Sequence, residues 1–256
     1  MALYHISFGR EDLGSNPPTT ALLSGDPERA FRIAETYLGE ARLLSDHRGL
    51  NSYIGLLPNG VPILSATSGM GAPSLSIVVN ELFQVGIRRI LRVGTTGSIQ
   101  PHVRAGSVVI SSAALCRQGA ADDIAPVEYP AAADPFLTVA LARAARELGV
   151  EHHVGITASV DTFYEGQERV DTSANPNVLR RLRGVTDEYR RLNILNYEME
   201  CGTLFKMAGV YGFAAGCVCG VIAQRTAAES VVAEQKATAV DNAIRVAIRA
   251  LMNSAG

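Results

Sequence analysis

This 256-residue chain has arginines beside glycines near the ends of its apolar runs. Their type and spacing are the first indication of a site that could bind an anion. Arg29 comes four residues after Gly25, with Asp26 and Pro27 between them. A flexible glycine ahead of a helix N-terminus leaves oriented N–H groups that attract an anion. The same segment is also typical of a plain turn in which Asp26 caps the helix, so both interpretations stay open for it.

Arg92 gives the stronger indication of an anion site. It lies near the end of an apolar run and is followed by Gly94-Thr95-Thr96-Gly97-Ser98. An arginine in an apolar strand is costly to bury unless it meets an anion, and the glycines and hydroxyls allow close approach and hydrogen bonds. With Arg29 and Arg48 as candidate neighbours, Arg92 predicts a site for a small oxyanion such as phosphate. The competing interpretation is a surface arginine beside a turn.

The polar segment 161–169 carries planar groups that are suited to a flat heterocycle. Gln167 offers a donor and an acceptor, Arg169 offers a fork of donors, and Phe163 offers a stacking face. A solvated polar loop is the alternative for this segment.

Two carboxylates, Glu198 and Glu200, stand two residues apart where a predicted strand gives way to a helix. A carboxylate that accepts two hydrogen bonds is a common way to hold a vicinal diol. Carboxylates at a helix N-terminus also have a purely structural use, which is the competing interpretation.

The elements that must position these residues alternate between strands and helices. Apolar runs with β-branched residues predict strands, and residues three and four apart on one apolar face predict helices. The strands are Thr20–Leu23, Val61–Thr67, Arg89–Val93, Ser107–Ser112, Val154–Ser159, Ile194–Tyr197 and Ala214–Ile222, and the helices are Ser74–Val85, Pro135–Leu148 and a final helix with Ala237, Val240, Ile244, Ala247, Ile248 and Leu251 on its apolar stripe. This alternation predicts an α/β fold with a largely parallel sheet, and places the ligand site in the loops after the strands.

Composition narrows the class of protein. Hydrophobic residues make up 47% of the chain, charged residues 19%, and the formal net charge is −2. We therefore expect one domain spanning residues 1–256, with no nucleic-acid or membrane partner. The four cysteines fit neither a disulfide framework nor a CxxC zinc site, and no secretory signal is visible at the N-terminus, so we expect a cytoplasmic protein.

Two segments resemble sequence motifs of other protein classes, namely membrane helices and dinucleotide-binding proteins. The uncharged stretch 207–224 has the glycine spacing of packed membrane helices, but its hydrophobicity is marginal, and we predict a helix end, a turn near Gly212 and a buried strand. The turn at 67–74 resembles a dinucleotide-binding fingerprint, but Ser74 replaces its third glycine and no acidic residue follows the next strand. A nicotinamide cofactor is therefore not expected.

Taken together and in order, these segments closely resemble the uridine phosphorylases of the nucleoside phosphorylase family, from Tyr4 to the final helix. Single segments are ambiguous, whereas their order is specific. The matching segments are Gly25-Asp26-Pro27 with Arg29, Ser45-Asp46-His47-Arg48, Gly94 to His102, Phe163 to Arg169, Asn196-Tyr197-Glu198-Met199-Glu200, and Val221 to Thr226. The resemblance implies the nucleoside phosphorylase fold, a three-layer α/β/α arrangement with a mixed central sheet. It also implies a homodimer, or a hexamer built from dimers, whose active sites are completed across the dimer interface.

The resemblance also implies a role for each site residue. Gly25, Arg29, Arg92 and Thr95 would bind phosphate, with Arg48 arriving from the partner subunit. Met199 and Glu200 would hold the ribose, Glu198 would support that loop, and His5 from the partner would meet the 5′-hydroxyl. Gln167 and Arg169 would recognise the base, with Arg225 orienting Arg169 or a pyrimidine oxygen, and the walls of the base site would be Phe163, Thr96, Gly97 and Ile222.

The implied reaction is reversible phosphorolysis of uridine to uracil and ribose 1-phosphate in pyrimidine salvage, a pentosyl transfer. Inorganic phosphate is a co-substrate, and no metal or organic cofactor is expected. Purine-cleaving relatives carry an aspartate where this chain has Gln224-Arg225-Thr226, which favours a pyrimidine. Gly49 stands where bacterial relatives use a glutamate to bind an interface cation, so the resemblance gives no support for that cation site.

Three alternatives remain open at this point. A purine nucleoside phosphorylase of the same fold would use the same phosphate site. A nucleosidase would use water, which needs no arginine cluster. A catalytically inactive nucleoside-binding protein would keep the same pocket. The sequence leaves the choice among uridine, thymidine and deoxyuridine undecided, because that choice depends on the placement of Met199 and Glu200.

Overall fold

The computed structural model describes residues 1–226, 229–230 and 233–253. Within them, ten strands form one mixed sheet in the order β10-β9-β6-β7-β8-β5-β1-β4-β3-β2. The strands are β1 (Thr20–Ser24), β2 (Gly39–Ser45), β3 (Ser52–Leu56), β4 (Pro62–Thr67), β5 (Arg89–Ser98), β6 (Val108–Arg117), β7 (His152–Val160), β8 (Asn196–Glu198), β9 (Ala214–Arg225) and β10 (Glu229–Ser230). The seven predicted strands are all present, and β2, β3 and β10 were not predicted.

The sheet is less parallel than the alternation of elements predicts. Strands β1, β4, β5 and β9 pair in parallel, as do β6, β7 and β8. The β2–β3, β3–β4, β5–β8, β6–β9 and β9–β10 pairs are antiparallel. The mixed sheet that the family resemblance implies is therefore correct, and the largely parallel sheet is wrong, because short connections such as that between β3 and β4 return the chain antiparallel.

Strand β9 also pairs with β5, so that β5, β8, β7, β6 and β9 close into a ring. Closure of this ring brings together the ends of strands that are distant in sequence. The register places Thr95 beside Gly220 and Gly97 beside Ala223, with an irregularity between Thr96 and Gly97.

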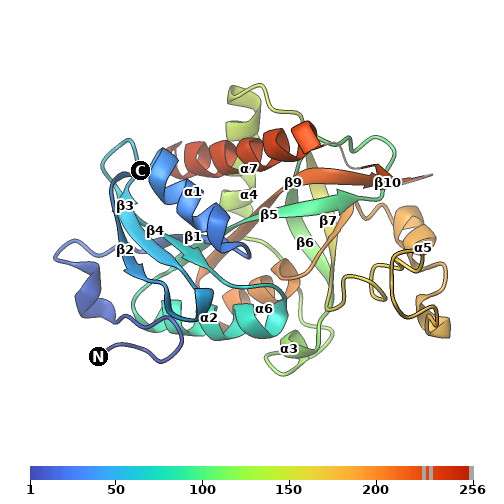
Figure 1. Ribbon diagram of the computed structural model, residues 1–256, viewed down its shortest axis with the longest axis horizontal. Coiled ribbons are helices and arrows are strands. Elements are labelled where there is room, and N and C mark those ends of the chain that lie inside the picture. The colour runs from blue at the N-terminus through green and yellow to red at the C-terminus, as the bar shows by residue number, and fades with distance from the viewer. Residues whose placement is uncertain (227–228, 231–232, 254–256) are drawn as a thin grey trace.

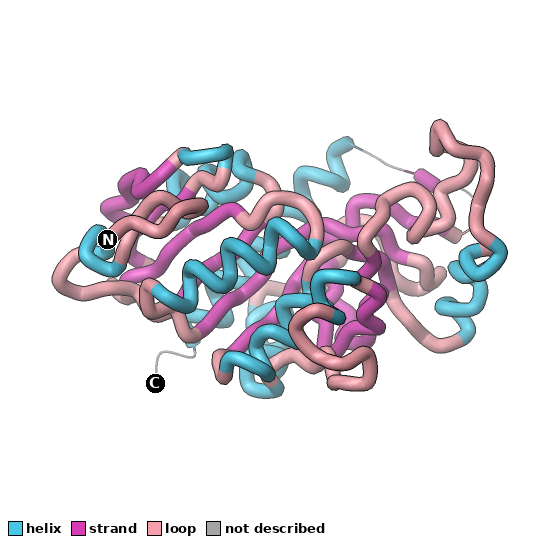
Figure 2. Tube along the Cα trace, turned by 90° about the horizontal axis from the view of Figure 1, so that it is seen from below, coloured by secondary structure: helices cyan, strands magenta, loops and turns pink. Residues whose placement is uncertain are grey.

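Helices cover both faces of the sheet, as Figure 1 shows, and complete the three-layer α/β/α arrangement. One apolar core packs α2 (Ala72–Gln84) and α6 (Cys201–Tyr211) on one face, with short α3 (Gly119–Asp122) nearby. A second core packs α1 (Pro27–Tyr37), α4 (Pro135–Glu147) and α7 (Ala233–Asn253) on the other face. Helix α5 (Val185–Arg191) and its loops lie at the end of the molecule opposite the N-terminus (Figures 1 and 2).

Local sequence signals explain where the helices begin and end. The Asp26 side chain accepts a hydrogen bond from the backbone N–H of Glu28, and Pro27 follows as the first residue of α1. Gly212, in the left-handed conformation, ends α6 before β9 begins, as predicted for the uncharged stretch. In the final helix Ala237 is exposed, whereas the predicted Ile244, Ala247, Ile248 and Leu251 are buried.

None of the helices in the described part of the chain combines the length and the apolar character needed to cross a bilayer.

Candidate active site

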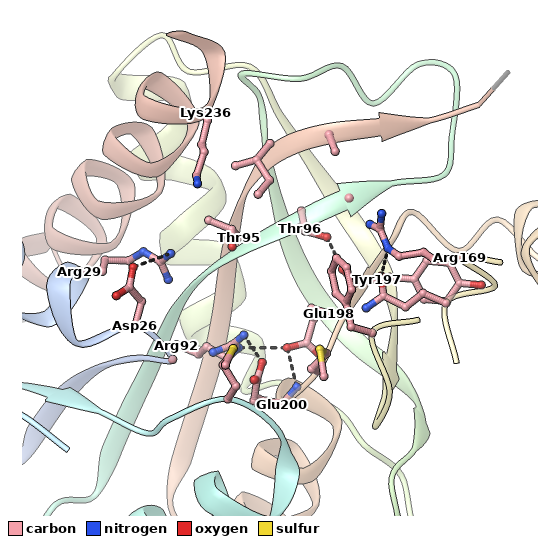
Figure 3. Close-up of a pocket in the computed structure, with 18 of the residues that line it drawn as sticks. Asp26, Arg29, Arg92, Thr95, Thr96, Arg169, Tyr197, Glu198, Glu200 and Lys236 are labelled. Atoms are coloured by element: carbon pink, nitrogen blue, oxygen red, sulfur yellow. Dashed lines mark hydrogen bonds and ion pairs between the residues drawn. The ribbon is translucent and has the colours of Figure 1, made fainter. Parts of the chain in front are cut away.

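A cavity of about 560 Å³ opens at the carboxyl ends of β1, β5 and β9, beside the junction of β8 and α6 (Figure 3). It brings together thirteen of the sixteen predicted site residues. These are Gly25, Arg29, Arg92, Thr95, Thr96, Gly97, Phe163, Gln167, Arg169, Glu198, Met199, Glu200 and Ile222. The remaining three, His5, Arg48 and Arg225, do not line it.

Two arginines and a glycine form one end of the cavity. Arg29 extends from the first turn of α1 and donates a hydrogen bond to the backbone oxygen of Val93, at 3.2 Å. Among the described residues, the Nε atom of Arg29 and the Nη1 atom of Arg92 are buried without a hydrogen-bond partner. A side chain at Gly25 would approach that same Nη1 atom to 3.9 Å. Buried donors without partners predict an acceptor that fills the space, which matches the predicted oxyanion site.

Burial and nearby carboxylates shift the pKa values of these two arginines in opposite directions. Burial lowers the pKa of Arg29, and Asp26, at 3.8 Å, offsets part of that effect. Burial also lowers the pKa of Arg92, but Glu200 and Glu198 outweigh it and hold that pKa well above its ordinary value. Both guanidiniums are therefore positively charged at neutral pH.

Glu198 fixes the turn from β8 into α6. It is buried and accepts hydrogen bonds from Nε of Arg92 at 3.0 Å, from the backbone N–H of Glu200 and Cys201 at 2.9 Å each, and from the Ser159 hydroxyl. A carboxylate with this many donors is held in one orientation. The geometry fits the supporting role that the resemblance implies for Glu198.

Glu200 lies in the cavity between the two ends. Its carboxylate accepts from the backbone N–H of Gly71 at 2.6 Å and forms an ion pair with Arg92. Burial raises the pKa of Glu200, with repulsion from Glu198 adding to the effect and attraction from Arg92 opposing it. The carboxylate is thus placed for further hydrogen bonds, such as those from a vicinal diol.

The loop after β7 supplies the other end of the cavity. Nε of Arg169 donates to the Gln167 side-chain oxygen at 3.3 Å, and the Arg169 guanidinium stacks on the Phe163 ring at 4.2 Å. Glu168, in the left-handed conformation at φ 53°, turns away between them and accepts hydrogen bonds from the backbone N–H groups of Gly184 and Thr186. The loop therefore presents Gln167 and Arg169 side by side, and Glu168 anchors it to the start of α5.

Gly97 leaves the space that these side chains need. A Cβ atom there would lie 3.3 Å from Cδ of Arg225 and 3.4 Å from Nη2 of Arg169. Arg225 and Arg169 therefore both approach Gly97, although Arg225 does not line the cavity.

Residues 94–98 are not a loop, contrary to the strand-exit interpretation. They continue β5 because β9 pairs with them along their whole length and β8 pairs with Gly97 and Ser98. The strand thus lays Thr95, Thr96 and Gly97 along the cavity floor, where the regular strand geometry holds them more firmly than a loop would.

His5 and Arg48 lie together on the surface, outside the chain's own cavity. Nδ1 of His5 lies 2.6 Å from a Glu81 oxygen, at the rim of a second cavity of about 610 Å³. Tyr4 joins the two residues, because its ring packs edge-on against His5 and its hydroxyl accepts from Arg48 at 3.3 Å. The two residues predicted to arrive from a partner therefore share one surface.

Six residues that line the cavity are not among the predicted site residues: Asp26, Pro27, Met70, Tyr197, Ala223 and Lys236. Asp26 and Tyr197 stand inside segments that were singled out, but Asp26 was assigned only a capping role and Tyr197 none. Lys236 lies in the first turn of α7, for which the sequence predicts only an apolar stripe. No local signal marks it as a cavity residue.

One buried group of potential metal ligands is present in the described residues, formed by Glu198, Cys201 and Cys217 with ligand atoms within 4.8 Å of one another. The Glu198 oxygens are engaged by Arg92, Ser159 and backbone N–H groups. Glu198 in this group is therefore already held by hydrogen bonds within the chain.

Comparison with known proteins finds one family model and several relatives that carry the same name. A family model described as the phosphorylase superfamily matches residues 19–252. The chain is 44% identical to a uridine phosphorylase of Haemophilus influenzae, covering 89% of this chain and 88% of that protein. It is 40% identical to the uridine phosphorylase of Escherichia coli, over 97% and 96%. It is also 40% identical to that of Thermococcus kodakarensis, over 93% and 83%.

Proposed function

The chain belongs to the phosphorylase superfamily, and on that premise we propose that it is a uridine phosphorylase, which splits uridine with inorganic phosphate into uracil and ribose 1-phosphate. It is thus a pentosyltransferase. One observation carries the proposal: a single cavity holds unpartnered arginine donors at one end, Gln167 and Arg169 at the other, and Glu200 between them.

In the reaction, phosphate attacks C1′ of the ribose as the bond from C1′ to N1 of uracil breaks. Positive charge develops on the sugar and negative charge on the leaving base. Arg29 and Arg92 hold the phosphate on the open face of the sugar, which supplies proximity and an anion beside the developing cation. Glu200, which is paired with Arg92, accepts hydrogen bonds from the 2′- and 3′-hydroxyls.

Gln167 and Arg169 stabilise the departing base. Their N–H groups donate to the uracil oxygens, and Gln167 also has an acceptor for N3–H. These hydrogen bonds strengthen as the ring becomes anionic, so they lower the barrier more than they tighten ground-state binding. The contact between Arg169 and the Phe163 ring helps to hold the guanidinium in place at the base end.

A pyrimidine is favoured over a purine. The carboxylates that line the described cavity are Asp26, Glu198 and Glu200, and each lies within 4.0 Å of an arginine of the phosphate end. The base end offers the Gln167 amide and the Arg169 guanidinium, which suit a leaving pyrimidine anion.

We also propose that the reaction needs no metal or organic cofactor, because the arginines and the base loop supply the charge that both halves of the transition state require. A homodimer is the proposed building block, since His5 and Arg48 lie outside their own cavity on one shared surface. The four free cysteines fit the reducing cytoplasm that we propose as the location. The place in pyrimidine salvage follows from the proposed reaction.

The test follows the absorbance of uridine with purified protein, with and without inorganic phosphate, and uses inosine as a parallel substrate. Loss of uridine only when phosphate is present is the expected result. Cleavage of inosine at a similar rate would refute the assignment of the base end, and cleavage without phosphate would refute that of the arginines. Uridine binding without turnover at any phosphate concentration would indicate an inactive binding protein.

A further inference from the structure

We propose that Lys236 is an additional phosphate ligand, which closes the phosphate end of the cavity from the side of α7; the proposal rests on the proposed function. Lys236 lines the cavity, and Figure 3 shows its side chain reaching from α7 toward Thr95 and Arg29. It stands on the opposite side of that end from Arg92, which comes from β5.

The chain contains only two lysines, and they differ completely in environment. Lys206 is buried, and its amine donates to the backbone oxygen of Pro126 at 2.8 Å and lies 3.7 Å from Asp122. Lys236 is exposed and has neither a hydrogen bond nor an ion pair with any residue in the described ranges. Its ammonium group is therefore available to a ligand in the cavity.

The charge balance of the phosphate end leaves room for a further cation from this chain, beside the Arg48 that is expected from the partner subunit. Arg29 and Arg92 face Asp26, Glu198 and Glu200, a formal balance of −1 before any phosphate enters. Phosphate adds further negative charge in a partly buried space where charges are weakly screened. Lys236 brings the balance of this chain's own residues to zero.

A lysine suits this position better than a third fixed arginine. Its ammonium is a compact charge on a flexible stem with three donors, so it can follow phosphate as the group moves from solution onto C1′. Arg29 and Arg92 are held by Val93, Glu198 and Glu200 and cannot follow in this way.

The first experiment compares Lys236→Gln and Lys236→Arg with the wild type in phosphate-dependent turnover of uridine. Loss of a charged hydrogen bond should raise the KM for phosphate about tenfold in Lys236→Gln and leave the KM for uridine within twofold. Lys236→Arg should retain most of the affinity. Arg249→Gln, an exposed position further along α7, is the matched control and should match the wild type. A phosphate KM in Lys236→Gln within twofold of wild type overturns the proposal.

The second experiment does not depend on turnover. The protein is acetylated with an amine-selective reagent, with inorganic phosphate or with chloride at equal ionic strength, and the modified peptides are quantified by mass spectrometry. Phosphate should slow acetylation of Lys236 severalfold and leave that of the N-terminal amine unchanged. Equal rates at Lys236 in both buffers overturn the proposal. If wild-type protein fails to cleave uridine but phosphate protects Lys236, the proposed function falls and the phosphate ligand stands.

Discussion

Replacement of Arg29 by methionine isolates the contribution of the phosphate end to catalysis. The Arg29 side chain is only 10% exposed, yet it makes one hydrogen bond to the chain, to Val93, and a 3.8 Å ion pair with Asp26, which is 48% exposed. Methionine keeps the length and the apolar contacts of the side chain. The folded state thus loses about 1 kcal/mol for the hydrogen bond and about 0 to 1 kcal/mol for the ion pair.

The expected effect on catalysis is much larger than the effect on stability. Loss of a donor aimed at an anion in the transition state costs about 2.7 to 4 kcal/mol, which lowers kcat/KM for phosphate about 100- to 1,000-fold. A destabilisation of about 1 to 2 kcal/mol lowers Tm by only about 2 to 8 °C in a chain of this size. Steady-state assays with varied phosphate and thermal unfolding by circular dichroism measure the two effects separately.

Arg32→Met is the matched control. Arg32 lies three residues further along α1, donates to Asp241 at 2.9 Å and does not line the cavity. It should lose a similar amount of stability and less than threefold in kcat/KM. The reasoning is refuted if Arg29→Met keeps kcat/KM within threefold of wild type, or if Arg32→Met loses activity to the same extent.

Three further changes test other parts of the site. Arg92→Ala should lower kcat/KM about 100- to 1,000-fold. It should also destabilise the fold by about 3 to 5 kcal/mol, because it leaves Glu198 and Glu200 buried without their cation. Near-wild-type turnover in this variant would contradict the assignment of Arg92 to the phosphate site. The pKa of Glu200 is raised above its ordinary value of 4.5, so kcat/KM for uridine should fall as the pH drops through that raised pKa. This fall on the acid side of the pH profile should vanish in Glu200→Gln. If the variant keeps it unchanged, Glu200 is not its source. The same shift makes folding stability fall as pH rises between the unfolded and folded pKa values, which urea unfolding at several pH values measures. Gly97→Ala should push Arg169 by a few tenths of an ångström and raise the KM for uridine about tenfold with little change for phosphate, as initial rates would show.

Much of the site was predictable because many of its functional residues lie within short segments of the sequence. Gly25 to Arg29, Phe163 to Arg169 and Asn196 to Glu200 each keep their functional groups within a few residues, and all three segments reach the cavity. The helix boundaries at Pro27 and Gly212 follow from capping and from backbone conformation, which neighbouring residues decide.

Prediction failed where the outcome depends on partners distant in the chain. The predicted strand at Arg89–Val93 extends to Ser98 because β9 and β8 pair with it, and no local pattern distinguishes that extension from a glycine-rich loop. Strand β2 was missed because it is almost wholly exposed and so lacks an apolar alternation. The lysine at position 236 becomes a cavity residue only because α7 packs across β9.

The sequence by itself therefore determined which groups are present and which local elements carry them: the arginines, the base loop, the paired carboxylates and most of the strands and helices. Only the tertiary structure decided that Arg92 meets a carboxylate 108 residues away, that two guanidinium donors remain unpartnered in a buried space, and that Lys236 faces them. The physical reason is the range of the interactions. Caps, turns and periodicity act over a few residues, whereas strand order and ring closure are set by the packing of the whole chain.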